Sequence, residues 1–110
     1  MKTYLAIYHA APEAMAQMST ATAEQKAEGM KHWFAWKDLI GESLIDFGAP
    51  LAGGVNISPD GAKRTSAREV SGFSIVQAEN ADAAQALFEE HPHLNWHPSA
   101  SIEVHEYVAM

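Results

Sequence analysis

Two segments of this sequence have the composition of β-strands and are apolar on both of their alternating faces. At residues 3–9, TYLAIYH, one face would carry Tyr4, Ala6 and Tyr8 and the other Leu5 and Ile7, and the two faces are about equally apolar. At residues 70–79, Phe73 and Ile75 alternate with further apolar side chains. A sheet with one face in water should alternate apolar with polar residues, so the pattern predicts a sheet that is covered on both faces.

A long helix is expected between these two strands. Thr20 or Thr22 can cap it, and Gln25 stands in the capping-box position relative to Thr22. Apolar residues then recur at spacings of three or four: Trp33, Trp36, Ile40, Leu44 and Phe47. This spacing predicts one amphipathic helix that ends at Gly48.

The rest of the chain predicts two more strands and a second helix. Residues 49–58 are a weak strand because they contain two glycines, and SPDG at 58–61 is a turn sequence that starts a hairpin. Asn80 is a good N-cap for a helix that should run to about His91, where a proline follows. Residues 101–110 alternate apolar with polar side chains, as a final strand does.

The resulting order is strand, helix, strand, strand, helix, strand. It predicts an α+β domain over residues 1–110 with the ferredoxin-like βαββαβ arrangement, in which two helices cover one face of a four-stranded antiparallel sheet. The other face is also apolar, and a second sheet packed on it is the simplest cover. We therefore expect a homodimer that closes through the open sheet face.

Charge and composition exclude several kinds of partner. The chain has 14 acidic and 7 basic residues, a formal net charge of -7, so a nucleic acid would be repelled. It has no cysteine, which excludes disulfides, thiolate metal sites and a cysteine nucleophile and favours a reducing compartment. No apolar run is long enough for a membrane span. We expect a soluble, cytoplasmic protein.

Histidines gather after the second predicted helix, where His91, His93 and His97 have an HxHxxxH spacing. One interpretation is a small-molecule site in which His91 or His93 carries a proton. A second is a helix cap, with His91 at the negative end of the helix dipole and the other histidines in solvent. A third is a zinc, copper or nickel site. Because two prolines interrupt the segment, the side chains need not converge, and we expect no bound metal.

Aromatic and basic side chains supply further candidates. Trp36 could line a pocket, although its helical spacing also fits core packing, and Trp96 in the histidine loop is either a lid or a dimer contact. Arg68, near Arg64 in a basic segment, could hold a carboxylate or enolate, or could lie on a solvated hairpin. The sequence contains no phosphate-binding glycine loop, no HExxH, no GxSxG and no dinucleotide fingerprint, so no cofactor is expected.

Four segments together resemble the YCII-related domain family, small bacterial proteins of the dimeric α/β-barrel type: TYLAIYH, DFGAPLAGG, SGFSIVQAENADAAQALFEEHPH and SIEVHEY. The resemblance covers nearly the whole chain and implies the same fold, with dimerisation. Better understood relatives look like small-molecule enzymes, one of them a dehydrochlorinase, that use a His with an Asp in a cleft. Here His91 occupies the position of that Asp. The helical His falls near Lys37, and the nearest histidine, His32, lies more than a turn away.

The leading hypothesis is a cofactor-free small-molecule enzyme or ligand-binding protein that uses histidine acid–base chemistry in a cleft. As an enzyme it would be lyase- or hydrolase-like and act on a small organic acid. The alternative is a non-catalytic dimeric accessory or regulatory module. The candidate catalytic residues are His91, His93 and His32. The candidate ligand-binding residues are Trp36, Lys37, Arg68 and Trp96.

Overall fold

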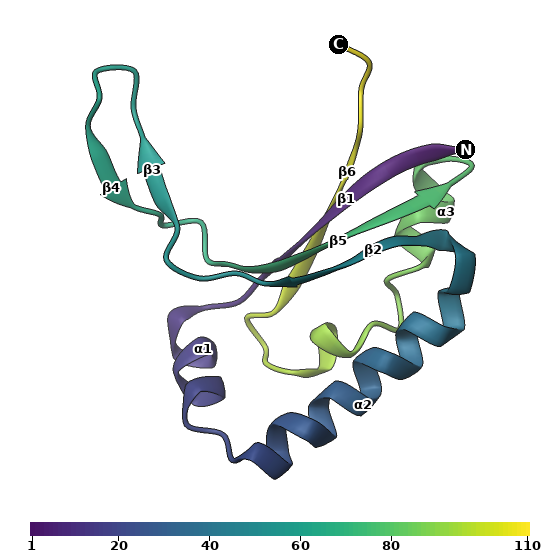
Figure 1. Cartoon of the computed structure of the whole chain (residues 1–110), viewed down its shortest axis with the longest axis horizontal. Helices are drawn as coiled ribbons and strands as arrows, with labels where there is room; N and C mark the ends of the chain where they lie inside the picture. The colour runs from purple at the N-terminus through teal and green to yellow at the C-terminus, as the bar shows by residue number, and fades with distance from the viewer.

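A four-stranded antiparallel sheet organises the computed structural model, which describes residues 1–110 (Figure 1). Its strands are β1 (Lys2–His9), β2 (Leu44–Pro50), β5 (Val70–Ala78) and β6 (Ser101–Glu106), in the order β2-β5-β1-β6. The helices are α1 (Pro12–Ser19), α2 (Ala23–Ile40) and α3 (Ala81–Ala86), with 3-10 turns η1 (Gly41–Ser43) and η2 (Pro92–Asn95). The predicted α+β class and the antiparallel sheet are confirmed.

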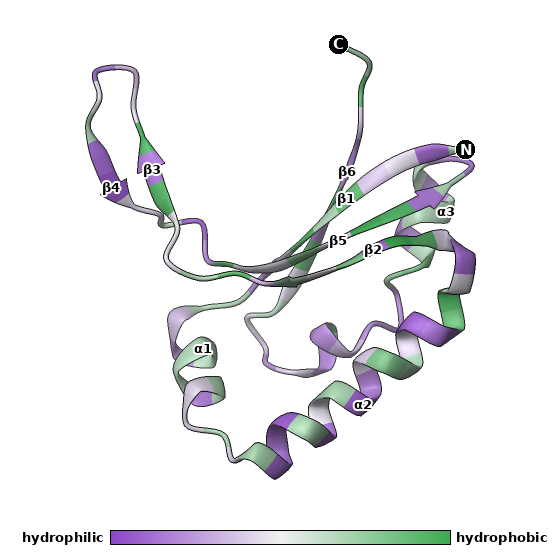
Figure 2. Cartoon of the chain, in the orientation of Figure 1, coloured by the Kyte–Doolittle hydropathy of each residue, from purple (hydrophilic) through white to green (hydrophobic).

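The core lies between the sheet and the helices, which Figure 1 shows on one side of the sheet. Alternate residues of β1 and β5 are buried there, with side chains from the helices and from the turn after α3: Tyr4, Ala6, Tyr8, Val76, Ala78, Trp36, Ala84 and Phe88. The intervening residues of these two strands, such as Ile7 and Phe73, point to the other face and are half-buried. No element lies over that open face, although its strands are hydrophobic along much of their length (Figure 2).

Helix α2 begins as predicted and ends earlier than predicted. The Thr22 side chain accepts a hydrogen bond from the Gln25 N–H, and the Gln25 side chain accepts one from the Thr22 N–H, so the capping box is confirmed. The helix stops at Ile40 because Gly41 leaves the helical conformation with a positive φ of 51°, which glycine adopts readily. The predicted continuation to Phe47 is wrong. The next apolar residues belong to β2, since a short apolar run fits a strand as well as a helix.

Gly48 is needed in the structure, but not to end a helix. It lies in an irregular part of β2 with φ 79°, where a Cβ atom would overlap the carbonyl group of Phe73 in β5. Any side chain at this position would push the two strands apart.

The predicted weak strand at residues 49–58 is divided between two sheets. Pro50 ends β2, and residues further on form β3 (Val55–Ile57), which pairs with β4 (Lys63–Thr65) in a separate hairpin. The predicted turn at residues 58–61 closes this hairpin. In Figure 1 the hairpin stands away from the main sheet, on the side opposite the helices.

Helix α3 is shorter than predicted. Asn80 caps it through a 2.8 Å hydrogen bond from the Ala83 N–H, which confirms the predicted start. The helix ends at Ala86 and not near His91, which instead has an extended backbone with ψ 135°. Pro92 imposes that conformation, because its ring disfavours the helical region for the residue before it. His91 therefore caps the start of η2 and does not sit at the end of a long helix.

None of the three helices is both long and apolar enough to cross a lipid bilayer.

Candidate functional site

The histidines fall into two groups because neighbouring residues of β1 face opposite sides of the sheet. Tyr8 faces the helices and belongs to the buried group, and His9 faces the open side.

His91 is the centre of the buried group and has no exposed surface. Its ring centroid lies 4.4 Å from that of Trp33, 4.4 Å from that of Trp36 and 5.0 Å from that of Tyr8. Its Nδ1 accepts a 2.9 Å hydrogen bond from the backbone N–H of His93, which assigns the ring proton to Nε2. The aromatic rings leave this imidazole inside the protein core.

A chain of hydrogen bonds continues from His91 across the sheet. The Nε2–H donates to the Tyr8 hydroxyl at 3.2 Å, and that hydroxyl donates to Ser74 Oγ at 2.8 Å. The Ser74 hydroxyl in turn donates to the Phe47 carbonyl at 2.7 Å. Burial lowers the pKa of His91 to about 3, with a smaller contribution from nearby His93, and burial also raises the pKa of Tyr8. The network is therefore neutral near pH 7.

His93 links the buried group to the open face. It is buried, and burial lowers its pKa. Its Nε2–H donates a 2.8 Å hydrogen bond to the backbone carbonyl of His9. The side chain of His93, on the helix side of the sheet, thus anchors the backbone of His9. The imidazole of His9 itself lies on the open side.

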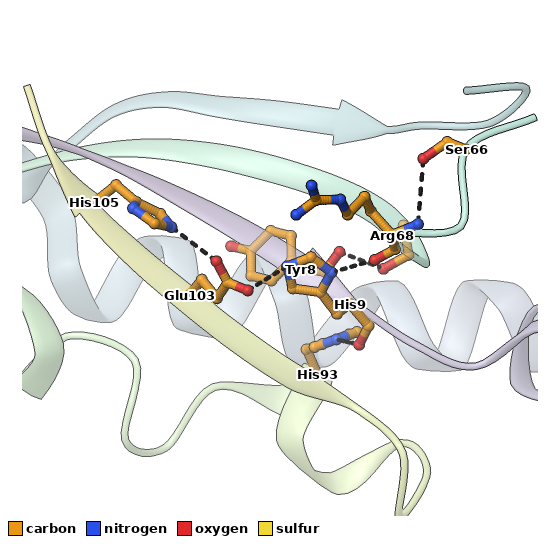
Figure 3. Close-up of polar contacts among 8 residues, drawn as sticks. Tyr8, His9, Ser66, Arg68, His93, Glu103 and His105 are labelled. Atoms are coloured by element: carbon orange, nitrogen blue, oxygen red, sulfur yellow. Dashed lines mark hydrogen bonds and ion pairs between the residues drawn. The ribbon is translucent and has the colours of Figure 1, made fainter. Parts of the chain in front are cut away.

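The open face contains a hollow of about 420 Å³ near the end of β1. Ile7 and Val70 are its apolar lining residues, and two serines contribute hydroxyl groups. Its ionisable lining residues are His9, Arg68, Glu69 and Glu103. Figure 3 shows how the side chains of β1, β6 and the segment before β5 meet there.

His9 is held in one tautomer. Its Nδ1–H donates a 2.8 Å hydrogen bond to the backbone carbonyl of Arg68, so the proton of the neutral ring is on Nδ1 (Figure 3). Its Nε2 is buried, and no neighbouring group forms a well-angled hydrogen bond with it. Glu103 Oε2 lies 3.0 Å away. In the neutral ring Nε2 is therefore a free lone pair, and in the imidazolium its proton pairs with the carboxylate.

Glu103 contacts a second histidine on the same face. Its Oε1 lies 2.8 Å from His105 Nε2, and this hydrogen bond is the main reason that the pKa of Glu103 is lowered. The strand register explains the grouping, because Glu103 is opposite Ile7 and His105 is opposite Leu5 in the β1–β6 pair. Glu103 is thus a carboxylate between two imidazoles.

The backbone around His9 is irregular. The register of β1 with β5 shifts between Tyr8 and His9, and Glu69 has φ 56°, the only positive φ at a residue other than glycine. Such a conformation costs a non-glycine residue about 1–2 kcal/mol, and strained backbone gathers at functional sites. The Ser71 hydroxyl also donates to the Tyr8 carbonyl at 3.1 Å. These backbone features direct the carbonyl group of Arg68 toward the His9 ring.

The structure brings four of the sequence-predicted site residues together in the buried group. Trp36 packs on His91 inside the core, and its indole N–H donates to the Leu87 carbonyl at 2.8 Å. The ring of Trp96 lies 5.5 Å from that of His93. His91, His93 and Trp36 are all at most 3% exposed, so they support the sheet from behind and do not line the hollow.

The other three predicted site residues are dispersed. His32 and Lys37 are exposed on α2, on the helix side of the sheet, and the Lys37 ammonium lies 5.6 Å from the Phe47 ring centroid. Arg68 is the one predicted residue that lines the hollow. The sequence interpretation missed His9 and Glu103, whose only signals were their places in two strands far apart in the chain.

No group of three or more histidine or acidic side chains is arranged to hold a metal ion.

No family model matches the sequence, and no curated protein matches it significantly. A solved structure that does match is 5-chloro-2-hydroxyhydroquinone dehydrochlorinase from Burkholderia phenoliruptrix, in complex with 2,5-dihydroxybenzoquinone. The TM-score is 0.58 at 14% sequence identity, over 96% of this chain and 93% of that chain. The two chains share a fold.

Proposed function

We propose that this protein is a cofactor-free, YCII-related enzyme that transfers a proton on a small organic acid in the hollow of the open face. The observation that carries the proposal is the imidazole of His9, which has one nitrogen anchored to the backbone and the other free beside a carboxylate. The fold, shared with an enzyme that acts on a single-ring compound, supports it.

His9 is the proposed proton carrier. Glu103, which lines the hollow, takes a proton from the ligand and passes it to His9 Nε2, 3.0 Å from its Oε2, and the imidazolium that forms is stabilised by the restored carboxylate. Throughout, Nδ1–H stays bonded to the Arg68 carbonyl, so the ring keeps its orientation. The proton then returns to the ligand at another atom or leaves with a leaving group, and His9 is neutral again.

Arg68 is the proposed anion-binding residue. Its guanidinium is a permanent cation on the wall of a hollow that also contains two carboxylates, and it would bind the carboxylate or enolate oxygen of the ligand. The volume of about 420 Å³ lies within the usual range for small-molecule sites. Under this proposal His91 and His93 position the sheet behind the site, Trp36 and Trp96 pack on them, and His32 and Lys37 do not contact the ligand.

We further propose the ferredoxin-like form of the fold and a homodimer of the dimeric α/β-barrel type, closed through the open sheet face. Support comes from half-buried apolar residues on that face that no element covers: Leu5, Ile7, Phe73 and Ile75. A second copy would cover them and would also close the hollow. Light scattering at micromolar concentration should give the mass of two chains, and the mass of one chain would contradict this. A bacterial origin and a cytoplasmic location are part of the same proposal.

The ligand-binding half of the proposal can be tested with 2,5-dihydroxybenzoquinone, a planar organic acid and the molecule bound in the dehydrochlorinase structure. Calorimetric titration should detect binding to the wild type. Arg68→Gln should weaken it by about tenfold or more, the loss of one charge-assisted contact. Arg64→Gln is the matched control, because it removes the same charge from β4, outside the lining of the hollow. Equal effects of the two substitutions would contradict a site at Arg68.

The catalytic half can be tested with the same probe in heavy water. Exchange of its ring C–H for deuterium, followed by proton NMR, requires proton transfer at carbon. The wild type should accelerate this exchange and His9→Gln should abolish the acceleration, whereas His32→Gln, an exposed position on α2, should leave it intact. Binding without any acceleration by the wild type would support the alternative, a non-catalytic binding module.

A further inference from the structure

We infer that the β3–β4 hairpin is an arm that packs against the C-terminal segment of a second copy, at the opposite end of that copy's sheet. The inference rests on the homodimer proposed above and specifies how its two chains are oriented.

Backbone hydrogen bonds close the hairpin at its tip and at its base, on either side of the three paired residues of each strand. At its tip, Ser58 N–H donates to the Ala62 carbonyl at 2.9 Å, and Gly61 N–H donates to the Ser58 carbonyl at 2.9 Å. At its base, Ser66 N–H donates to the Gly54 carbonyl at 2.8 Å. The arm is therefore a formed ribbon and not a loose loop.

This ribbon leaves its apolar side chains in solvent. Every residue of β3 and β4 is exposed, including Val55 at 59% and Ile57 at 67%. These two side chains share one side of the ribbon, and Asn56 between them is on the other. An isolated two-stranded ribbon is only marginally stable in water, so covering Val55 and Ile57 would stabilise it.

The position of the arm indicates a second copy as its partner. The hairpin projects on the open side of the sheet, so a body that covers that face lies beside the arm (Figure 1). The C-terminal segment after β6 projects on the same side. It carries Val108 at 77% and Met110 at 122% exposure.

The arm and the C-terminal segment leave from opposite ends of the sheet. The hairpin precedes Val70, which pairs with His9 at the end of β1. The C-terminal segment starts at Tyr107, whose N–H donates to the Thr3 carbonyl near the start of β1. They also leave from opposite edges, because the hairpin joins β2 to β5, the C-terminal segment follows β6, and the strand order is β2-β5-β1-β6. A two-fold axis in the plane of the sheet and diagonal to the strands exchanges these two corners. It therefore places each arm beside the partner's C-terminal segment, where apolar side chains are free on both.

Charge favours the exchange of ends. Lys63 and Arg64 lie in β4, and an arrangement with like ends together would place both pairs of cations close to each other. With the two corners exchanged, the cations of one arm are kept apart from those of the other arm.

The absence of native cysteines allows a direct test by cross-linking. The double variant Ile57→Cys, Val108→Cys should form a disulfide-linked dimer on oxidation, seen as twice the chain mass on a non-reducing denaturing gel. Ile57→Cys alone should not. The control is Ile57→Cys, Leu39→Cys, because Leu39 is 75% exposed on α2 and should likewise remain a single chain.

A second measurement uses two substitutions that add the same negative charge to opposite sides of the ribbon. Ile57→Asp should raise the dimer dissociation constant by about tenfold or more in analytical ultracentrifugation, and Asn56→Asp by less than about threefold. A wild-type dimer that neither cross-links in the double variant nor responds to Ile57→Asp would overturn the arm and leave the proposed dimer intact. Efficient cross-linking of Ile57→Cys alone would overturn the exchange of ends. A wild-type monomer would overturn both the dimer and the arm.

Discussion

His91 and His9 have their proton on opposite ring nitrogens, although both rings are anchored to the backbone through Nδ1. In His91 the backbone partner is an N–H group, so Nδ1 accepts and Nε2 carries the proton. In His9 the partner is a carbonyl, so Nδ1 carries the proton and Nε2 is free. The contact with the His93 N–H thus makes the His91 ring a hydrogen-bond donor within the core. The contact with the Arg68 carbonyl makes the His9 ring a potential base beside the hollow.

The surroundings of the two rings reinforce this difference. The Nε2–H of His91 donates to the Tyr8 hydroxyl, so both ring nitrogens form hydrogen bonds, and the surrounding aromatic rings exclude a ligand. The Nε2 of His9 lies 3.0 Å from Glu103 Oε2 without a well-angled hydrogen bond, and the His9 side chain is 17% exposed. Burial with complete hydrogen bonding makes a histidine structural, and an unused lone pair beside a cavity makes it a candidate for chemistry.

The largest expected difference between the two histidines is in the free energy of unfolding. His91→Ala should cost about 3–4 kcal/mol, because it leaves a cavity among aromatic rings and an unpaired Tyr8 hydroxyl. His9→Ala should cost about 1 kcal/mol or less, since it removes one hydrogen bond at a partly exposed position. Urea denaturation at pH 7 measures both. Similar costs would remove the distinction between a structural and a functional histidine.

The next prediction concerns pH. The pKa of His91 is about 3 in the folded protein against an ordinary value of 6.5, so the unfolded chain binds more protons between these pH values. Its contribution to stability is present above pH 6.5 and is lost as the pH falls, at up to about 1.4 kcal/mol per pH unit. The expected loss between pH 6.5 and 5 is about 2 kcal/mol, and His93 adds to it in the same direction.

The control for the pH prediction is His91→Gln, which does not titrate. Its stability should depend less steeply on pH in this interval, as measured by urea denaturation at a series of pH values. A charged His91 at the C-terminal end of a long second helix would behave in the opposite way, with a contribution that grows on acidification. An identical pH dependence in wild type and variant would show that His91 is not held in its neutral form.

A smaller effect is expected from the strained residue beside the hollow. Glu69→Gly should raise the free energy of unfolding by about 0.5–1 kcal/mol, because glycine accepts φ 56° at little cost, partly offset by the greater entropy of the unfolded chain. Glu69→Ala is the matched control, since it removes the side chain and keeps the unfavourable φ. A stability gain from Glu69→Ala as large as that from Glu69→Gly would assign the effect to the carboxylate and not to the backbone.

The smallest expected effect is confined to one ionisation. His105→Gln removes the main cause of the lowered pKa of Glu103 and should move that pKa back toward its ordinary value. Carboxyl carbon NMR during an acid titration measures it. His97→Gln is the control, because His97 bonds to Ser99 in the loop and not to Glu103. No change in His105→Gln would mean that His9 alone holds the carboxylate.

Local sequence determined where the helices begin and where the hairpin turns. Thr22 and Asn80 cap their helices, and residues 58–61 turn the hairpin, because each device acts through hydrogen bonds and backbone preferences within a few residues. The alternation in β1 and β5 was also sufficient to predict a sheet with two apolar faces. These features together led to the correct α+β class.

Tertiary structure decided where α2 ends and what the histidines do. The spacing of Phe47 fits a helical stripe, but pairing of β2 with β5 places it in a strand. The clustered histidines near residue 91 were conspicuous in the sequence, yet their burial depends on aromatic side chains from β1 and α2, which are distant in the chain. His9 and Glu103 meet only because β6 pairs with β1 across most of the chain. Strand register and burial are properties of the whole fold, so residues that are inconspicuous in the sequence form the candidate site.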